Sequence, residues 1–354
     1  MARVTGKKTL RLAVDANALD SASSMASLNQ GAELLRKGGT VAFPTETVYG
    51  LGANALDPAA VQAIFEAKQR PAWDPLIVHI AGQIVGNHQL RLVAADIPAN
   101  GRLLMEAFWP GPLTLLLPKG AAVPSIVTAG RARIGVRMPR HPVARKLIEI
   151  AQLPIAAPSA NSFGKTSPTR ADFVLQDLAG RIDAVIDAGD ATLGLESTVV
   201  DVCDEQPVLY RPGMVTLQQL QAICPALIAY REPPDGESAS QSMPSPGLGL
   251  KHYSPRARLI LREGITGAGQ LLELAEQLHA VGEIVGIMLP GSISDLPFLT
   301  FDWGDLADQQ QLARRLFAGL RELDTAGATV ILCPLPEDTG LGVAIRDRLL
   351  KAAR

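Results

Sequence analysis

The chain has 354 residues, which is long for one ordinary domain and suits two, each able to bury its own core. Hydrophobic residues make up 47% and charged residues 19%, a composition that excludes a disordered protein. The formal net charge of -2 argues against a surface built throughout to hold nucleic acid, so any charge-based function must be local.

The first part of the chain predicts a mixed α/β fold. The first fourteen residues read as a tail that ends in a short strand. In chain order the pattern then predicts a helix at 28–37, a strand at 40–43, a helix at 58–69, a strand at 76–80 and a helix at 97–108. Strands follow at 113–117 and 134–138, and then a helix at 143–151. The last predicted elements of this part are strands at 155–157, 185–187, 198–202 and 208–210 and a helix at 217–223. Because some adjacent strands lack a helix between them, we expect a mixed twisted sheet with helices.

A segment rich in proline, glycine and serine divides the chain. Residues 231–247 hold four prolines, two glycines and four serines, the composition of an interdomain linker. Beyond it, strands are predicted at 259–261, 284–288 and 330–333, and helices at 268–280, 306–323 and 343–353. We therefore divide the chain into a tail (1–14), a mixed α/β domain (15–225), a linker (226–256) and a smaller Rossmann-like α/β domain (257–354).

Cysteine usage and hydropathy indicate the compartment. Cys203, Cys224 and Cys333 stand far apart, with no histidine at metal-ligand spacing, so we expect reduced core thiols and no protein-bound metal. No stretch reaches the roughly eighteen apolar residues of a membrane span, and the N-terminus has no apolar run of secretory length. These features predict a soluble, cytoplasmic protein with no membrane partner.

Basic residues gather between Glu106 and Glu149, where no acidic residue occurs. They are Lys119, Arg131, Arg133, Arg137, Arg140, Arg145 and Lys146. Arg137 lies inside the apolar segment 134–139, so its guanidinium is expected to be partly buried and to need an anionic partner, either a bound phosphate or a structural carboxylate. A solvated basic face is the alternative for the run as a whole.

Polar side chains follow the strand at 40–43. Thr45 and Thr47 would present hydroxyls there, with Glu46 pointing the other way if all three belong to the strand. Residues 49–52 (Tyr-Gly-Leu-Gly) suggest a turn with exposed backbone amides. Such groups at a strand end are typical of a ligand site in an α/β protein.

Further polar groups fall at other element ends. Lys68 and Arg70 close a predicted helix, where they either complement the helix C-terminus or form a fork for polyphosphate. Residues 159–166 (Ser-Ala-Asn-Ser-Phe-Gly-Lys-Thr) lack the first glycine of a phosphate loop, and Pro168 follows too soon, so we reject that motif. Four further polar groups at strand ends remain as hydrogen-bonding ligands: Ser159, Asn161, Ser197 and Arg211.

The five histidines form no metal or triad spacing, and no Ser or Cys lies in a nucleophile elbow. The residues thus favour phosphoryl or nucleotidyl transfer by positioning and charge stabilisation.

The ordered motifs resemble the threonylcarbamoyl-AMP synthases of the long, two-domain Sua5 type, whose catalytic part is a YrdC-like domain. The resemblance runs from about residue 20 to the end. Its blocks are PTETVYGLGANA at 44–55, KQRP at 68–71, PLIVHI at 75–80, WPGPLT at 109–114, VRMPRHP at 136–142, APSAN at 157–161, GLESTVVD at 194–201 and RPG at 211–213.

The resemblance implies a nucleotidyltransferase that converts L-threonine, bicarbonate and ATP into threonylcarbamoyl-AMP and pyrophosphate. It places Thr45, His79 and Ser197 near threonine. It assigns ATP binding to Lys68, Arg70, Ser159, Asn161 and Arg211, and catalysis to Lys68, Arg70 and Arg137. Mg²⁺ would accompany ATP without a protein cage. The product would pass to a separate transferase that modifies tRNA beside the anticodon, so tRNA would be met only indirectly.

The resemblance also assigns His252 and Tyr253 to a lid over the site. The chain departs from the family at Leu248-Gly249-Leu250, where Met-Lys-Tyr is often found, and at Trp73-Asp74, where Asp-Asn is common.

Two other functions compete with this one. A carbamoyl-adenylate-forming enzyme of hydrogenase maturation would carry zinc-finger and acylphosphatase regions ahead of the domain, and this chain has only three cysteines. An RNA-binding module could use the basic face at 119–146 without turnover, although aromatic residues for base stacking make up only 4% of the chain.

Overall fold

The computed structural model describes residues 7–231, 253–265, 267–291, 293 and 295–354. Its contacts divide the chain into two compact units. The first consists of 1–163, 168–191 and 196–249, and the second of 164–167, 192–195 and 250–354. Most of the predicted linker, including its departure at 248–250, lies outside the described residues. Within them, no helix combines the length and apolar character needed to cross a membrane.

The described part of the first unit is built on an eleven-stranded sheet. In spatial order its strands are β1 (Leu10–Ala13), β8 (Ala184–Asp187), β2 (Val41–Phe43), β3 (Gly50–Asn54), β7 (Ile155–Ala156), β4 (Ile77–His79), β6 (Arg133–Arg137), β5 (Leu113–Pro118), β9 (Thr198–Asp201), β10 (Val208–Arg211) and β11 (Ile228–Ala229). β4 and β6 pair in parallel while β5 and β6 pair antiparallel, which confirms the predicted mixed sheet.

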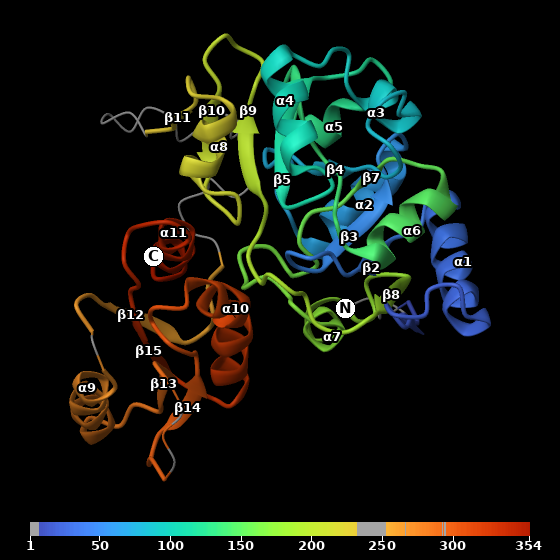
Figure 1. The fold of residues 1–354 in the computed structure, drawn as a ribbon. Coiled ribbons are helices and arrows are strands. Elements are labelled where there is room, and N and C mark those ends of the chain that lie inside the picture. Colours follow the sequence, from blue (N-terminus) through green and yellow to red (C-terminus); the bar gives the residue numbers. More distant parts are fainter. Residues whose placement is uncertain (1–6, 232–252, 266, 292, 294) are drawn as a thin grey trace. The chain divides into compact units, whose positions relative to one another are not determined.

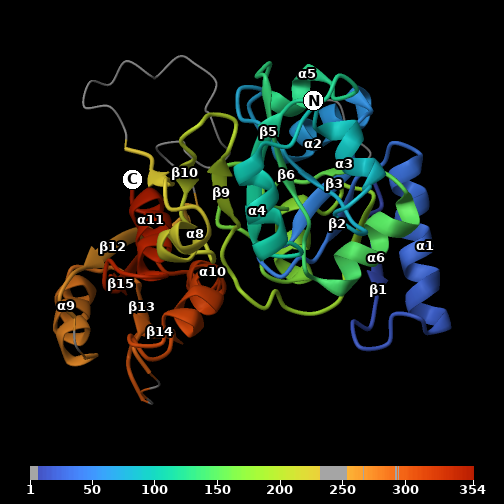
Figure 2. The same cartoon turned by 45° about the horizontal axis from the view of Figure 1, so that its top comes forward.

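Helices cover this sheet. They are α1 (Ala22–Arg36), α2 (Pro58–Lys68), α3 (His88–Val93), α4 (Ala99–Phe108), α5 (Ser125–Thr128), α6 (Pro142–Ala151), α7 (Ala171–Leu178) and α8 (Leu217–Ile223). α1 and α6 pack side by side (Figure 1, Figure 2) and contribute Leu28 and Leu147 to one buried cluster. Residues of α2 and α4, such as Ile64 and Leu104, belong to a second cluster. Both clusters are closed to solvent, so the sheet is a rigid base for the side chains it carries.

The helix boundaries follow from local capping. α1 begins six residues before the predicted start, because the Ser21 hydroxyl accepts a hydrogen bond from the Ser24 amide and caps the helix there. α2 matches its prediction, since the Asp57 carboxylate caps it and Pro58 occupies its first position. It ends where Gln69 turns into the left-handed region, at φ 55°.

The predicted turn at 49–52 is wrong. Residues Gly50–Asn54 form strand β3, which pairs antiparallel with β2, and the backbone amides there are buried. The glycines serve close packing: a Cβ added at Gly52 would lie 2.7 Å from both the Phe43 ring and the Ile155 side chain. β3 can therefore fit between β2 and β7 only without side chains at that position.

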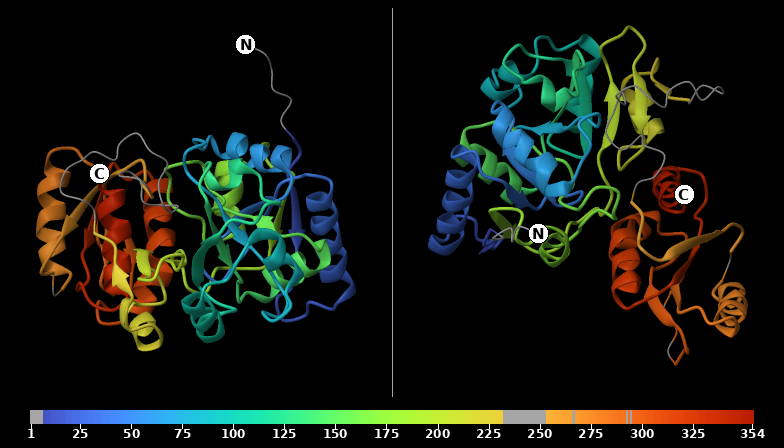
Figure 3. Two further views of the ribbon diagram at one scale, coloured as in Figure 1. Left: turned by 90° about the horizontal axis from the view of Figure 1, so that it is seen from above. Right: turned by 180° about the vertical axis from the view of Figure 1, so that it is seen from behind.

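The described part of the second unit holds a four-stranded sheet in the order β12 (Arg258–Arg262), β15 (Val330–Pro334), β13 (Val285–Leu289) and β14 (Leu299–Asp302). All its pairs are parallel, as expected for the predicted Rossmann-like domain. Its helices are α9 (Gly269–Ala280), α10 (Gln309–Thr325) and α11 (Gly342–Ala352). Ile287 clusters with Leu271 of α9, whereas its neighbour Met288 faces Gly319 of α10. α9 and α10 therefore cover opposite faces of this sheet (Figure 3).

Candidate active site

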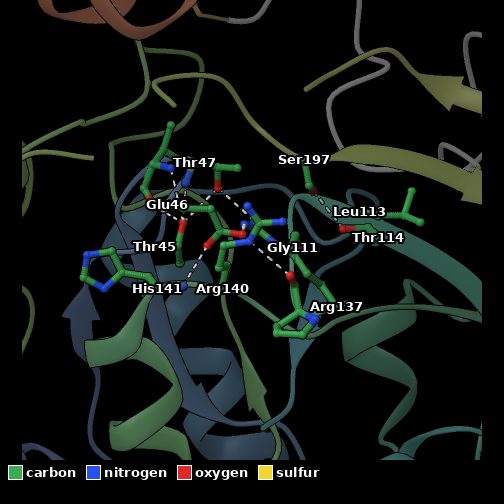
Figure 4. Close-up of polar contacts among 12 residues, drawn as sticks. Thr45, Glu46, Thr47, Gly111, Leu113, Thr114, Arg137, Arg140, His141 and Ser197 are labelled. Carbon is green, nitrogen blue, oxygen red and sulfur yellow. Dashed lines mark hydrogen bonds and ion pairs between the residues drawn. The ribbon is translucent and has the colours of Figure 1, made fainter. Parts of the chain in front are cut away.

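Arg137, at the end of β6, is the centre of a buried polar cluster (Figure 4). Its Nη2 lies 2.6 Å from Oε1 of Glu46, its Nη1 donates to the Thr47 hydroxyl at 2.8 Å, and its Nε donates to the Gly111 carbonyl at 3.1 Å. The guanidinium is thus held in one orientation by two other segments of the chain, one at residues 46–47 and one at Gly111. Such rigid placement is what an electrostatic catalyst requires.

The local fold of 45–48 explains why Glu46 reaches Arg137. The Thr45 hydroxyl accepts hydrogen bonds from the amides of Thr47 and Val48 and donates to the Val48 carbonyl, which closes a tight turn after β2. These residues are therefore no longer in a strand, and the expected alternation of Glu46 with the threonines does not hold.

Glu46 is the anionic partner that the sequence required for Arg137. Burial raises the pKa of this carboxyl, but the charge of Arg137 and hydrogen bonds from Arg137 and neighbouring backbone outweigh burial, so the pKa lies below its ordinary value. Its second oxygen also accepts the His141 amide at 3.3 Å. Of the two partners considered for Arg137, the structural carboxylate is present in the fold itself.

His79 lies beside Arg137, because β4 and β6 place the two residues in register. The imidazole packs edge-on against the Phe43 ring, with 6.2 Å between centroids. Burial, reinforced by the positive charge of Arg137, lowers the pKa of His79 to about 3. His79 is therefore neutral at physiological pH and can offer hydrogen bonds but not a positive charge.

This burial predicts a pH dependence of stability. Unfolded His79 takes up a proton as pH falls below 6.5, whereas the folded residue stays neutral down to a pKa of about 3, so stability is lost as the pH falls. Between pH 7 and pH 5 this amounts to about 2 kcal/mol. The difference in free energy of unfolding between wild type and His79→Asn, measured in urea, should therefore be about 2 kcal/mol smaller at pH 5 than at pH 7. If the free energies of unfolding of the two proteins change equally between pH 7 and pH 5, the burial of a neutral imidazole is contradicted.

The row of polar residues continues across the sheet. Thr114 of β5 pairs with Arg137 of β6, and its hydroxyl lies 2.8 Å from that of Ser197, just before β9. Arg211, at the end of β10, donates to both the carbonyl and the hydroxyl of Ser197 at 3.1 Å. The structure therefore brings together Ser197, expected at the threonine end, and Arg211, expected at the ATP end.

Lys68, the last residue of α2, does not extend into solvent. The side chain is buried, and its Nζ donates to the carbonyls of Ser159 and Asn161, each at 2.5 Å. This ammonium ties the end of α2 to the segment after β7, so three of the residues expected at ATP lie together. Lys68 lies at the C-terminal end of α2, as both interpretations of the sequence require.

Arg70 is also buried, and forms an ion pair with Asp74 at 2.9 Å. Its guanidinium donates as well to the carbonyls of Asp74 and Pro75. Burial raises the pKa of Asp74, against the opposing charges of Arg70, Lys68 and Arg211. The charges of Arg70, Lys68 and Arg211 all act on the Asp74 carboxyl, so these three cations expected at ATP lie near one another.

Glu46, Asp74 and Thr114 were not among the expected site residues. Asp74 had a signal, because it stands in the segment where the chain departs from the family pattern. Glu46 lies between the two threonines, and in a regular strand its side chain would point to the opposite face.

For the lid, His252 lies outside the described residues. The Tyr253 side chain is almost fully buried, with its ring stacked on Phe317 at 5.6 Å between centroids and the Arg348 guanidinium 5.3 Å from its centre. All three residues belong to the second unit. A lid role for Tyr253 stays a prediction.

Known proteins provide an independent comparison. A family model described as telomere recombination, for Sua5, YciO and YrdC proteins, matches residues 33–213, and the model of the threonylcarbamoyl-AMP synthase C-terminal domain matches 215–354. The threonylcarbamoyl-AMP synthase of Pyrococcus abyssi is 44% identical over 91% of this chain and 92% of its own length. That of Bacillus subtilis is 42% identical over 92% of both.

A solved structure agrees. The crystal structure of P. abyssi Sua5 complexed with L-threonine matches with a TM-score of 0.88 and 41% identity, covering 98% of each chain. The two family models together extend over both units. Each of the two relatives alone matches 91% or more of the chain. The chain therefore belongs to the threonylcarbamoyl-AMP synthase family, in its two-domain Sua5 form.

Proposed function

We propose that this protein is a nucleotidyltransferase that forms threonylcarbamoyl-AMP from L-threonine, bicarbonate and ATP. The observation that carries the proposal is the row of fixed polar groups from His79 through Arg137 and Thr114 to Ser197, with the Lys68, Arg70 and Arg211 cations around Asp74. The P. abyssi relative, solved with L-threonine, supports threonine as a substrate.

The reaction needs orientation and charge rather than a covalent nucleophile. The amine of threonine and bicarbonate combine with loss of water to give N-carboxythreonine. Its carboxylate oxygen then attacks the α-phosphorus of ATP, and the bond to the β-phosphate oxygen breaks to release pyrophosphate. Negative charge grows on the phosphate oxygens, so preorganised cations stabilise the transition state.

Each residue has a role in this scheme. Thr45, neutral His79 and Ser197 would hydrogen-bond threonine, and Arg137 would lie where the two substrates meet. ATP would be bound by Lys68, Arg70, Ser159, Asn161 and Arg211. Among these, Lys68 and Arg70 would supply positive charge near the phosphates, while the Lys68 contacts to Ser159 and Asn161 keep that segment in place.

Mg²⁺ fits as a companion of ATP. Within the described residues, no group of three or more His, Cys, Asp or Glu side chains could hold a metal ion, and the buried carboxylates Glu46 and Asp74 are paired with arginines. Polyphosphate oxygens of ATP would be its ligands, together with water. When bound, the ion would neutralise charge on the departing pyrophosphate.

The product is an activated carbamoyl adenylate, which suits a separate transferase acting on tRNA. Direct RNA binding by the 119–146 segment has less support, because several of its cations are neutralised. Arg133 pairs with Asp201 and Asp204, and Lys146 pairs with Asp20. Ion pairs of this kind reduce the charge available to phosphates of a nucleic acid.

Pyrophosphate release tests the proposal. We expect release from ATP and Mg²⁺ only when L-threonine and bicarbonate are both present, with each omitted in turn as a control. Release without threonine would identify another acceptor. No release, together with RNA affinity that falls steeply with salt, would favour the binding module instead.

A further inference from the structure

Two short segments of the chain lie in the second unit although the sequence around them belongs to the first. They are residues 164–167 and 192–195. The first begins three residues after Asn161, and the second ends two residues before Ser197. Both are therefore joined by only a few peptide bonds to residues of the proposed substrate site.

Helix α10 holds the first segment through Arg321. This side chain is buried, and both its Nε, at 3.1 Å, and its Nη2 donate to the Thr166 carbonyl. Two donors of one guanidinium on a single carbonyl fix the position of that peptide. A second tie comes from the Ser254 amide, which donates to the Gly164 carbonyl at 2.8 Å.

The same helix meets the second segment at Gly194. This residue has φ 77°, in the left-handed region that favours glycine. A Cβ placed there would lie 2.5 Å from the Cα and carbonyl oxygen of Arg314 and 2.6 Å from the Ala313 carbonyl oxygen. The backbone of the segment thus packs directly on the backbone of α10, which only glycine permits.

We propose that α10 of the C-terminal domain is a positioning element for both substrate ends of the site. Arg321 sets the segment that follows Ser159 and Asn161, at the nucleotide end. Gly194 sets the segment that precedes Ser197, at the threonine end. Arg321 and Gly194 act through these neighbours and touch no substrate themselves. The inference rests on the proposed function, because the two ends are defined by the residues assigned there.

The two contacts predict opposite kinetic effects. Arg321→Met removes both donors while keeping much of the volume, and should raise KM for ATP at least fivefold while KM for threonine changes less than twofold. Gly194→Ala should raise KM for threonine at least fivefold while KM for ATP changes less than twofold. Arg321→Lys keeps one charged donor group and should restore part of the ATP affinity. A purely structural role would lower the active fraction, and thus kcat, without separating the two KM values.

Matched controls are available in the same domain. Arg262→Met removes a cation from an exposed position of β12, and Gly282→Ala introduces a side chain at φ 92° with nothing within 4 Å. Both controls should leave the two KM values within twofold of wild type. Thermal unfolding establishes that each variant is folded. If Arg321→Met does not fold, the test uses Arg321→Lys and Gly194→Ala. The ratio of KM for ATP to KM for threonine in each is then compared with that of wild type.

The outcomes separate the two proposals. Wild-type turnover with unchanged KM ratios in the Arg321 and Gly194 variants would overturn the positioning role and leave the proposed function intact. A wild type that releases no pyrophosphate would contradict the proposed function first. Equilibrium binding of ATP and of threonine to the same variants would then test α10, since unchanged affinities in all of them would overturn its role as well.

Discussion

Replacing Arg137 with methionine should reduce pyrophosphate release at least a hundredfold, equivalent to about 2.7 kcal/mol of transition-state stabilisation. The guanidinium is fixed by Glu46, Thr47 and Gly111, so its charge is oriented before substrates arrive. The same change leaves the Glu46 carboxylate buried without that partner, and should lower the free energy of unfolding by about 3–5 kcal/mol. Steady-state kinetics and urea unfolding measure the two effects.

A double variant separates catalysis from stability. Glu46→Gln combined with Arg137→Met removes both charges and should recover much of the lost stability, but not turnover. Arg145→Met is a suitable control, because that arginine is partly exposed and lies 3.9 Å from Glu149. It should change the free energy of unfolding by no more than about 0.5 kcal/mol. Recovery of turnover in the double variant would remove Arg137 from the catalytic residues.

Lys68→Ala and Arg70→Ala should each lower pyrophosphate release at least tenfold, a loss of about 1.4 kcal/mol or more. For Lys68 two effects combine: a positive charge is lost, and the carbonyls of Ser159 and Asn161 lose the donor that holds them. For Arg70, the Asp74 carboxylate is left with less compensation and would repel phosphate. KM for ATP should rise more than KM for threonine in both variants.

Lys119→Met is the matched control for this pair. Its ammonium donates to the Val123 carbonyl at 3.0 Å and has no assigned part in the site. Turnover in this variant should stay within twofold of wild type. Near-normal release by both Lys68→Ala and Arg70→Ala, in protein shown to be folded, would exclude them from the ATP site.

The sequence predicts much of the fold because apolar periodicity is strong in its longer elements. α2 and the strands β5 and β6 lie within a residue or so of their expected ranges. Short elements escape the same reasoning: α3, α5 and α7 span six, four and eight residues, too few to show a clear helical period. β3 was missed because its glycines suit a turn, whereas in the fold Gly52 is required by close packing against Phe43 and Ile155.

The site residues were easier to name than their surroundings. Residue types and motif order pointed to Arg137, Lys68 and Ser197, but an ion pair such as Arg137 with Glu46 depends on which strands become neighbours. β6 pairs with β4 and β5, and the turn after β2 brings Glu46 to it from far away in the sequence. No local pattern encodes that meeting. The attachment of residues 164–167 and 192–195 to the second unit is non-local in the same way.

The position of the polar site residues within the sheet determines how the protein should lose activity on heating. His79, Arg137 and Thr114 come from β4, β6 and β5, which are interior strands flanked on both sides by other strands. Interior strands open only with the whole cooperative unit, whereas termini and surface loops open at lower cost. Loss of activity should therefore coincide with cooperative unfolding instead of preceding it, and a bound substrate would protect the entire sheet from thermal inactivation.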